Sequence, residues 1–182
     1  MKIFATIPNQ ITFARLASLP LFMFLILFQT TITTILAIVL FVLAAASDVA
    51  DGYLARSYRQ TTLFGKFADP IADKLLVAGA LIAFVQLGEL TAAPVMVIIA
   101  REFLVTGLRI LAVAEGKVIS ASILGKLKTI SHIALVLAIL IGRSFTLGPG
   151  GETAKSICLY VAIALALISG GEYFYRSRRL FV

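Results

Sequence analysis

The chain has 182 residues, of which 60% are hydrophobic and only 14% are charged, and its mean hydropathy is +1.04. A soluble domain of this length carries about a quarter charged residues, so the composition excludes an ordinary soluble protein. The net charge of +7 is interpreted as membrane topology and not as a nucleic-acid surface, because Lys and Arg collect on the cytoplasmic side of membrane helices.

Apolar runs close to the ~20 residues needed to cross a bilayer recur along the chain. They predict an all-α, polytopic membrane protein with six transmembrane helices in a single domain over residues 1–182. In chain order the spans cover about residues 11–28, 35–56, 65–87, 93–114, 122–141 and 153–175. Pro20 is a predicted kink in the first span. The breaks include a threonine-rich turn at 29–34, a basic loop at 57–62, and the turns Glu115-Gly116-Lys117 and Gly148-Pro149-Gly150-Gly151.

Six spans place both termini on the same side of the membrane. With the amino terminus inside, the outer ends keep Arg143 and Lys155, whereas the inner ends and loops hold Lys2, Arg15, Arg56, Arg59, Lys66, Lys117, Lys126, Lys128, Arg176, Arg178 and Arg179. This asymmetry predicts a multi-pass protein of the cell membrane with both termini in the cytoplasm. It also predicts that a polar cavity opens to the cytoplasm at the inner ends of the second and third spans.

One polar stretch, residues 48–73, contains all four aspartates of the chain: Asp48, Asp51, Asp69 and Asp73. Spacings of three and four residues put each pair on one face of a helix. Two antiparallel helices joined by a short loop would bring the pairs opposite each other. Carboxylates near hydrocarbon are costly and repel one another, whereas hard divalent cations take carboxylate ligands. The stretch therefore predicts a metal-dependent site with one ion, or with two about 3.5–4 Å apart.

The residues around the aspartates support a ligand site. Gly52, Ala55 and Gly65 would let a backbone approach a bulky ligand, and Arg56 returns to the face of Asp48. The dipeptide Asp69-Pro70 could begin a helix, with Asp69 as N-cap and Pro70 at the first position. If the helix instead begins at Gly65, Pro70 would fall in its first turn. Solvated helix caps would explain one or two aspartates, but not two spaced pairs.

Written out from Asp48, the stretch reads D-x2-D-G-x2-A-R-x8-G-x3-D-x3-D. This pattern resembles the signature of the CDP-alcohol phosphatidyltransferase family, with no position departing from it. The resemblance implies six membrane helices with the signature on the second and third. It also implies transfer of a phosphatidyl group from CDP-diacylglycerol to an alcohol with release of CMP, two Mg²⁺ or Mn²⁺ ions, and a homodimer in the lipid bilayer.

The resemblance also implies roles for individual residues. Asp48, Asp51, Asp69 and Asp73 would hold the metal ions, and Asp73 would also be the general base. The residues expected to contact or make room for the CDP-linked substrate are Gly52, Ala55, Arg56, Thr62 and Gly65. Near the amino terminus, Asn9 and Thr12 are expected to bind the cytidine or to shape the mouth of the cavity.

Two further stretches bear on the acceptor alcohol. I-P-N-Q-I-T-F-A-R, from Ile7, and I-I-A-R-E-F-L-V-T-G-L-R, from Ile98, resemble the branch of the family whose acceptor is sn-glycerol 3-phosphate. A phosphorylated acceptor calls for cations beyond the metal ions, and arginine can donate two parallel hydrogen bonds to phosphate. The candidates are Arg101, Arg109, Lys126 and Lys128.

Other interpretations of these residues remain open. Arg101 could pair with Glu102, the two lysines could be membrane anchors that reach toward lipid head groups, and His132 is expected to be a satisfied polar residue between helices. The acceptor could be another alcohol, as in the cardiolipin synthase or phosphatidylinositol phosphate synthase types. A metal-ion transporter would need acids spread through the membrane, whereas the aspartates cluster at one face. A non-catalytic scaffold is disfavoured because the residues expected of the site are all present.

Overall fold

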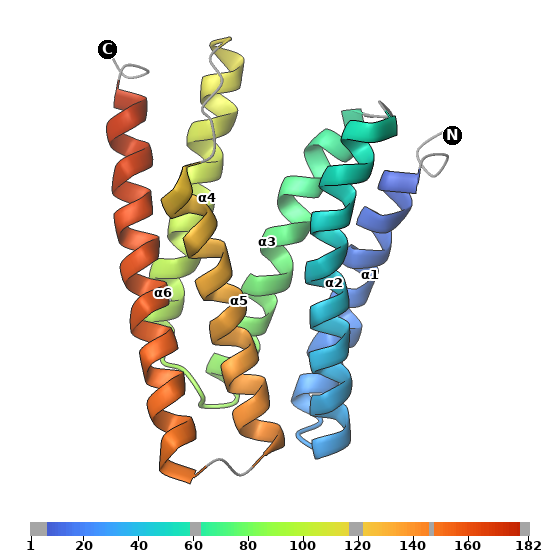
Figure 1. The fold of residues 1–182 in the computed structure, drawn as a ribbon, viewed down its shortest axis with the longest axis vertical. Coiled ribbons are helices and arrows are strands. Elements are labelled where there is room, and N and C mark those ends of the chain that lie inside the picture. Colours follow the sequence, from blue (N-terminus) through green and yellow to red (C-terminus); the bar gives the residue numbers. More distant parts are fainter. Residues whose placement is uncertain (1–6, 59–62, 117–121, 146–147, 179–182) are drawn as a thin grey trace. The chain divides into compact units, whose positions relative to one another are not determined.

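The computed structural model describes residues 7–58, 63–116, 122–145 and 148–178, and the regular structure within these ranges is entirely helical. The helices are α1 (Ile7–Leu27), α2 (Thr31–Tyr58), α3 (Leu63–Gln86), α4 (Ala92–Ala114), α5 (Ile123–Ser144) and α6 (Gly148–Ser177) (Figure 1). Side chains 7–12, 48–58, 63–70 and 73 lie outside the described part of the structure. The prediction of an all-α fold is confirmed for the described residues.

The threonine-rich segment predicted as a turn is the beginning of α2. The Thr33 amide donates to the Thr30 hydroxyl oxygen at 3.2 Å, and the Thr30 amide donates to the Thr33 hydroxyl oxygen at 3.2 Å. This reciprocal pair satisfies donors that a helix start leaves without partners. Gln29, just before it, has a positive φ of 55° at the turn from α1. The prediction that the second span begins at Ile35 was therefore wrong, because capping extends α2 back to Thr31.

The start of α3 also differs from both predicted alternatives. The helix begins at Leu63 and is continuous through Asp69 and Pro70. Asp69 is therefore not an N-cap, and Pro70 lies beyond the first turn. Both residues are part of the helix body, where a proline removes one backbone hydrogen bond.

The predicted glycine-rich turn at 148–151 is instead the first turn of α6. Gly148 has a φ of +59°, which suits the reversal into the helix. Pro149 follows it in the first turn, where a missing amide proton costs nothing. The Thr153 hydroxyl donates to the Pro149 carbonyl at 3.1 Å. The sixth helix is therefore one turn longer at its start than apolar composition suggests.

The boundaries around α4 and α5 agree with prediction to within a few residues. α4 ends where the Glu115 amide donates to the Leu111 carbonyl and Gly116 takes a φ of +69°. Only a residue free of a Cβ takes this conformation at little cost. α5 begins after Ser122, whose hydroxyl oxygen accepts from the Gly125 amide at 3.0 Å. These are ordinary helix ends that the polar residues between the spans indicate correctly.

The described chain forms two compact units. Unit 1 comprises Met1–Leu87 with Arg143–Phe145, and unit 2 comprises Gly88–Gly142 with Thr146–Val182. In unit 1, α1 packs against both α2 and α3, and the rings of Phe22 and Phe41 stack with centroids 5.6 Å apart. In unit 2, α4 packs against α6, and polar contacts described below tie α5 to both.

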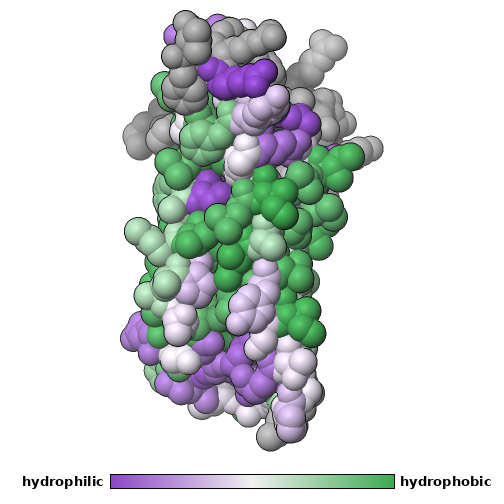
Figure 2. Space-filling view, turned by 90° about the vertical axis from the view of Figure 1, so that its left-hand side faces the viewer, coloured by the Kyte–Doolittle hydropathy of each residue, from purple (hydrophilic) through white to green (hydrophobic). Residues whose placement is uncertain are grey.

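Two described helices, α5 and α6, are long and apolar enough to cross a membrane. On the face shown in Figure 2, hydrophobic residues form a band across the middle, and hydrophilic residues lie toward both ends. Large apolar side chains on α6 are exposed, among them Ile157, Leu167 and Ile168, whereas the small Ala162 and Ala166 are buried. Exposed apolar patches of this kind mark a surface that contacts another apolar phase or molecule, and a lipid bilayer suits a band with two polar ends.

Candidate functional site

The eight residues of the aspartate signature lie on two helices of unit 1. Asp48, Asp51, Gly52, Ala55 and Arg56 are on the carboxy-terminal half of α2, and Gly65, Asp69 and Asp73 are on the amino-terminal half of α3. α2 and α3 contact each other, and residues 59–62 join them. The two halves that carry the signature therefore lie at the same end of unit 1 (Figure 1).

Helical backbone at both segments fixes which aspartates share a face. Asp48 and Asp51 lie one turn apart on α2, and Asp69 and Asp73 lie one turn apart on α3. Their side chains are outside the described residues, as are those of Asn9 and Thr12 on α1. Thr62 lies outside the described residues altogether.

The chemistry of these donors fits a hard divalent cation. Carboxylate oxygens are the ligands that Mg²⁺ and Mn²⁺ prefer, and two helices supply four carboxylates. Among the side chains that the structure does describe, no cluster of three or more His, Cys, Asp or Glu could hold a metal ion. Asp48, Asp51, Asp69 and Asp73 are therefore the residues to which a metal hypothesis applies.

A buried arginine lies beside the start of this stretch. The Arg15 side chain is 3% exposed, and its Nη2 donates to the hydroxyl oxygen of Ser47 at 3.1 Å. Ser47 directly precedes Asp48 in α2. Arg15 was predicted only as part of the inner positive charge, whereas the structure buries it between α1 and α2, next to the aspartate stretch.

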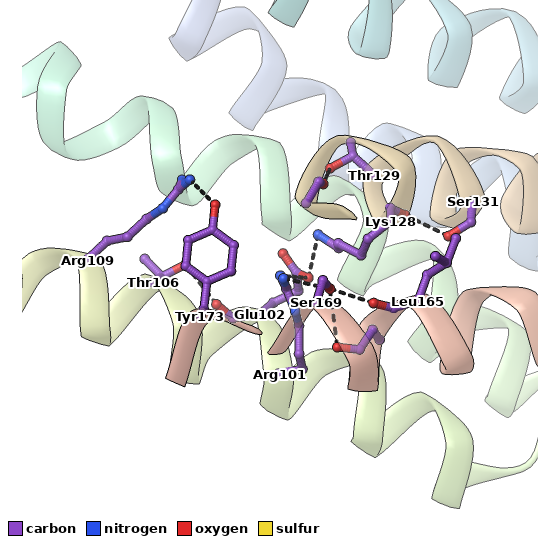
Figure 3. Close-up of polar contacts among 12 residues, drawn as sticks. Arg101, Glu102, Thr106, Arg109, Lys128, Thr129, Ser131, Leu165, Ser169 and Tyr173 are labelled. Carbon is purple, nitrogen blue, oxygen red and sulfur yellow. Dashed lines mark hydrogen bonds and ion pairs between the residues drawn. The ribbon is translucent and has the colours of Figure 1, made fainter. Parts of the chain in front are cut away.

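In unit 2, two of the four candidate phosphate ligands belong to a buried ionic cluster around Glu102 (Figure 3). Arg101 Nη1 donates to Glu102 Oε1 at 3.1 Å, and the Lys128 ammonium pairs with the same oxygen. Arg101 Nη2 also donates to Ser169 on α6 at 2.9 Å. The side chains of Arg101, Glu102 and Lys128 are 10%, 13% and 8% exposed. The cluster therefore joins α4, α5 and α6 through one carboxylate shared by two cations, and it realises the predicted pairing of Arg101 with Glu102.

The cluster depends on close helix packing at Gly170. A Cβ at this position of α6 would lie 3.2 Å from Arg101 Cγ, closer than ordinary van der Waals contact. His132, one turn after Lys128 on α5, is buried and hydrogen-bonds to the backbone of Ala162 on α6. It lies between helices as expected, but its hydrogen bonding is only half satisfied, because among the described residues its Nε2 is buried without a hydrogen-bond partner.

The other two candidates, Arg109 and Lys126, are exposed. Lys126 lies in the first turn of α5, and Arg109 lies near the carboxy-terminal end of α4. Arg109 Nη2 donates to the Tyr173 hydroxyl oxygen on α6 at 2.6 Å (Figure 3). Of the four cations, these two can therefore reach a ligand from solution without breaking a buried ion pair.

Sequence reasoning missed the structural parts played by Arg15 and Tyr173. For Arg15 there was a signal, because a charged residue inside an apolar helix needs a buried partner or a function. Tyr173 lies in an aromatic run near the end of the chain, Tyr173-Phe174-Tyr175, and nothing in that run distinguishes it from its exposed neighbours.

Comparisons with known proteins show which family the chain belongs to. The model of the CDP-alcohol phosphatidyltransferase family matches residues 5–168. A CDP-diacylglycerol–glycerol-3-phosphate 3-phosphatidyltransferase of Bacillus subtilis is 39% identical, with 94% of each chain covered. A protein of the same name from Rickettsia bellii is 35% identical over the full length of both chains. A probable phosphatidylglycerophosphate synthase of Mycobacterium tuberculosis is 37% identical, covering 96% of this chain and 83% of the relative. The family match spans both units and includes the whole aspartate signature, and so this chain belongs to the CDP-alcohol phosphatidyltransferase family.

Proposed function

We propose that the protein transfers the phosphatidyl group of CDP-diacylglycerol to sn-glycerol 3-phosphate, giving phosphatidylglycerophosphate and CMP in anionic phospholipid biosynthesis. The observation that carries this proposal is the complete aspartate signature on α2 and α3, in a chain similar over its full length to relatives that bear the name of this activity. The acceptor follows from those names and from the cations of unit 2.

The reaction needs a base for the acceptor and a good leaving group. Asp73 takes the proton of the acceptor hydroxyl as its oxygen attacks the phosphorus that carries diacylglycerol, and the bond from that phosphorus to the oxygen of CMP breaks. Asp48, Asp51 and Asp69, with Asp73, would hold two divalent cations, Mg²⁺ or Mn²⁺. When bound, these ions would neutralise the diphosphate and improve CMP as leaving group. No covalent enzyme intermediate is required.

The remaining signature residues serve the CDP-linked substrate. Arg56 contributes a positive charge and Gly52 a close backbone approach, while Ala55 and Gly65 leave space for the nucleotide. Asn9, Thr12 and Thr62 complete the cytidine end of the site.

The phosphate of the acceptor is bound chiefly by Arg109 and Lys126. Both are exposed, whereas Arg101 and Lys128 are engaged with Glu102 in the interior of unit 2. An exposed arginine that keeps unused N–H donors can bind phosphate through two parallel hydrogen bonds. Arg101 and Lys128 add positive potential behind these two ligands rather than replacing them.

The apolar helix surfaces and the excess of Lys and Arg at the predicted inner ends support a multi-pass protein of the cell membrane. In this arrangement six helices cross the bilayer, and both termini and the polar cavity face the cytoplasm. The active form is a homodimer, as the family resemblance implies.

An acceptor panel with purified protein tests the proposal. CMP release from CDP-diacylglycerol is measured with glycerol 3-phosphate, serine, inositol phosphate or phosphatidylglycerol, in Mg²⁺ and after chelation with EDTA. We expect release with glycerol 3-phosphate only, its loss on chelation, and its recovery with Mg²⁺ or Mn²⁺. Preference for another acceptor would move the protein to a different branch of the family, and turnover that persists in EDTA would contradict the role of the aspartates.

A further inference from the structure

Tyr173 joins three helices at the end of unit 2 that carries Arg109 and Lys126. Its side chain belongs to α6 and is 2% exposed, although the neighbouring Tyr175 is 66% exposed. The hydroxyl oxygen accepts one hydrogen bond from Arg109 Nη2 on α4, at 2.6 Å, and another from the backbone amide of Ser122 at the start of α5, at 3.3 Å. A buried tyrosine that satisfies donors from two other helices has little freedom to move.

The aromatic ring adds a second contact to the same guanidinium. Arg109 Cζ lies 5.1 Å from the Tyr173 ring centroid, and Arg101 Cζ lies 5.8 Å from it. Cations within about 6 Å of a ring centroid are attracted by its π-face. Both the hydroxyl and the ring of Tyr173 therefore restrain Arg109, and Figure 3 shows the Arg109 guanidinium directed at the Tyr173 hydroxyl.

The tyrosine also lies beside the first turn of α5. A Cβ at Gly125 would lie 3.4 Å from the Tyr173 hydroxyl oxygen and 3.5 Å from its Cε2, which is ordinary van der Waals contact, so the ring is about one methyl group away from the helix backbone. The Ser122 hydroxyl caps the same turn through the Gly125 amide. Lys126 follows directly, and its amide donates to the Ser122 carbonyl at 3.2 Å. The tyrosine thus sets where Arg109 lies relative to the turn that carries Lys126.

We infer that Tyr173 is a positioning residue for the acceptor phosphate, which acts by holding the Arg109 guanidinium near the start of α5, the helix whose first turn carries Lys126. This inference rests on the proposed function, because it assigns the two exposed cations to the phosphate of glycerol 3-phosphate. The hydroxyl of Tyr173 takes one N–H of a guanidinium that has five, so donors remain for the ligand. An arginine held in one conformation loses less side-chain entropy on binding than a free one, and the benefit appears as affinity for the acceptor.

The test is steady-state kinetics of Tyr173→Phe in the full-length protein, because this change keeps the ring and removes only the hydroxyl. We expect the KM for glycerol 3-phosphate to rise about tenfold, the size of effect typical of a hydrogen bond to a charged group. The KM for CDP-diacylglycerol and kcat at saturating acceptor should stay within about twofold of wild type, because the lost hydrogen bond serves only the binding of the acceptor. Tyr175→Phe, the same substitution two residues along α6, is the matched control and should change neither KM.

A double-variant cycle separates positioning from a general loss of structure. If Tyr173 acts through Arg109, then Arg109→Ala should raise the acceptor KM by itself, and Tyr173→Phe should add little in the Arg109→Ala background. Additive effects, an unchanged acceptor KM in Tyr173→Phe, or equal losses for both substrates would each overturn the inference while leaving the proposed function intact. Failure of wild-type protein to use glycerol 3-phosphate would overturn the proposed function, and the inference with it.

Discussion

Four cations in unit 2 could serve an acceptor phosphate, and they differ mainly in burial. Arg101 and Lys128 are enclosed with Glu102, whereas Arg109 and Lys126 are exposed. A buried pair loses its attraction if one member turns away to bind a ligand, and the charge left behind is costly. For single residues, burial therefore separates the cations engaged with Glu102 from the cations proposed to bind substrate, a separation that their spacing in the sequence does not reveal.

Lys126→Gln should mainly weaken use of the acceptor. Removing one exposed ammonium leaves helix packing unchanged but weakens the proposed attraction for the acceptor phosphate. We therefore expect the KM for glycerol 3-phosphate to rise roughly tenfold, which corresponds to a loss of about 1.4 kcal/mol in binding free energy. The KM for CDP-diacylglycerol and the melting temperature should not change. Lys155→Gln, the same change at the other end of unit 2, where the lysine pairs with Glu89, serves as the control. Acceptor kinetics unchanged by Lys126→Gln would remove this lysine from the phosphate site.

Asp73→Asn should nearly abolish turnover while leaving binding of CDP-diacylglycerol largely intact. An amide of the same shape cannot accept the acceptor's proton, and loss of a general base costs roughly 10²–10⁴-fold in rate. Single-turnover CMP release gives the rate, and equilibrium binding of a radiolabelled CDP-lipid gives the affinity. Glu152→Gln, the same change at an exposed carboxylate on α6, is the control. A variant that keeps its rate would show that Asp73 is not the base.

Among the elements, the helix bodies were predictable and several of the helix starts were not. Hydropathy locates α4 almost to the residue, because its apolar run ends at the plain break Glu115-Gly116. It misplaces the start of α2, because Thr30 and Thr33 cap the helix by a threonine pair in place of the usual Ser/Thr-x-x-Glu pattern. It also misplaces the start of α6, since glycine is a poor helix former, about 1 kcal/mol less favourable than alanine in a helix interior, and three of the residues 148–151 are glycines. Local side-chain hydrogen bonds decide these ends, and composition does not record them.

The partners that the charged residues of α4 find on other helices could not be predicted from the sequence. Arg101, Glu102 and Arg109 in one helix weaken its identification as a membrane span from composition. In the structure Glu102 pairs with Lys128 on α5, and Arg101 donates a hydrogen bond to Ser169 on α6. These partners are distant in the sequence, so helical periodicity could place the charges on α4 but could not say what they meet.

Glu102→Gln should destabilise the packing of α4, α5 and α6. It removes the carboxylate that the buried Arg101 and Lys128 share, and breaking a buried ion pair by removing one partner costs about 3–5 kcal/mol. The melting temperature of the purified protein in detergent should fall clearly, and Glu115→Gln, at the exposed end of the same helix, should leave it unchanged. An unaltered melting temperature in Glu102→Gln would mean that the cluster contributes nothing to the association of these helices.

For the whole molecule, the family could be predicted from the sequence alone because all positions of the signature lie close together, within residues 48–73. Eight fixed positions lie within one stretch of α2 and α3, and the family match then extends to residues 5–168. The division into two compact units was not foreseen, since the apolar runs continue across both and carry no linker. The proposed acceptor contacts depend on side chains from α4, α5 and α6 together, which is why burial in the structure was needed to rank them.

The topology prediction can be tested across the whole chain with single cysteines. In a Cys158→Ser background, Thr91→Cys and Phe145→Cys lie at predicted outer ends, and Glu115→Cys and Arg178→Cys lie at predicted inner ends; all four positions are exposed in the structure. A membrane-impermeant maleimide should label the first two in intact cells and the last two only after permeabilisation, because the positive charge flanking the inner ends is retained in the cytoplasm.

The inner pair is the more informative half of that experiment. Glu115 and Arg178 lie at the end of unit 2 that also carries Arg109, Lys126 and Tyr173. The side of the membrane on which Glu115 and Arg178 lie is therefore also the side from which an acceptor would enter. A water-soluble phosphate ester cannot cross hydrocarbon unaided, since burying its charge without a partner is prohibitively costly. Labelling of Glu115→Cys in intact cells would therefore contradict both the predicted orientation and a supply of the acceptor from the cytoplasm. If this cysteine is labelled only after permeabilisation, the cations of unit 2 lie on the cytoplasmic side that the charge asymmetry predicts.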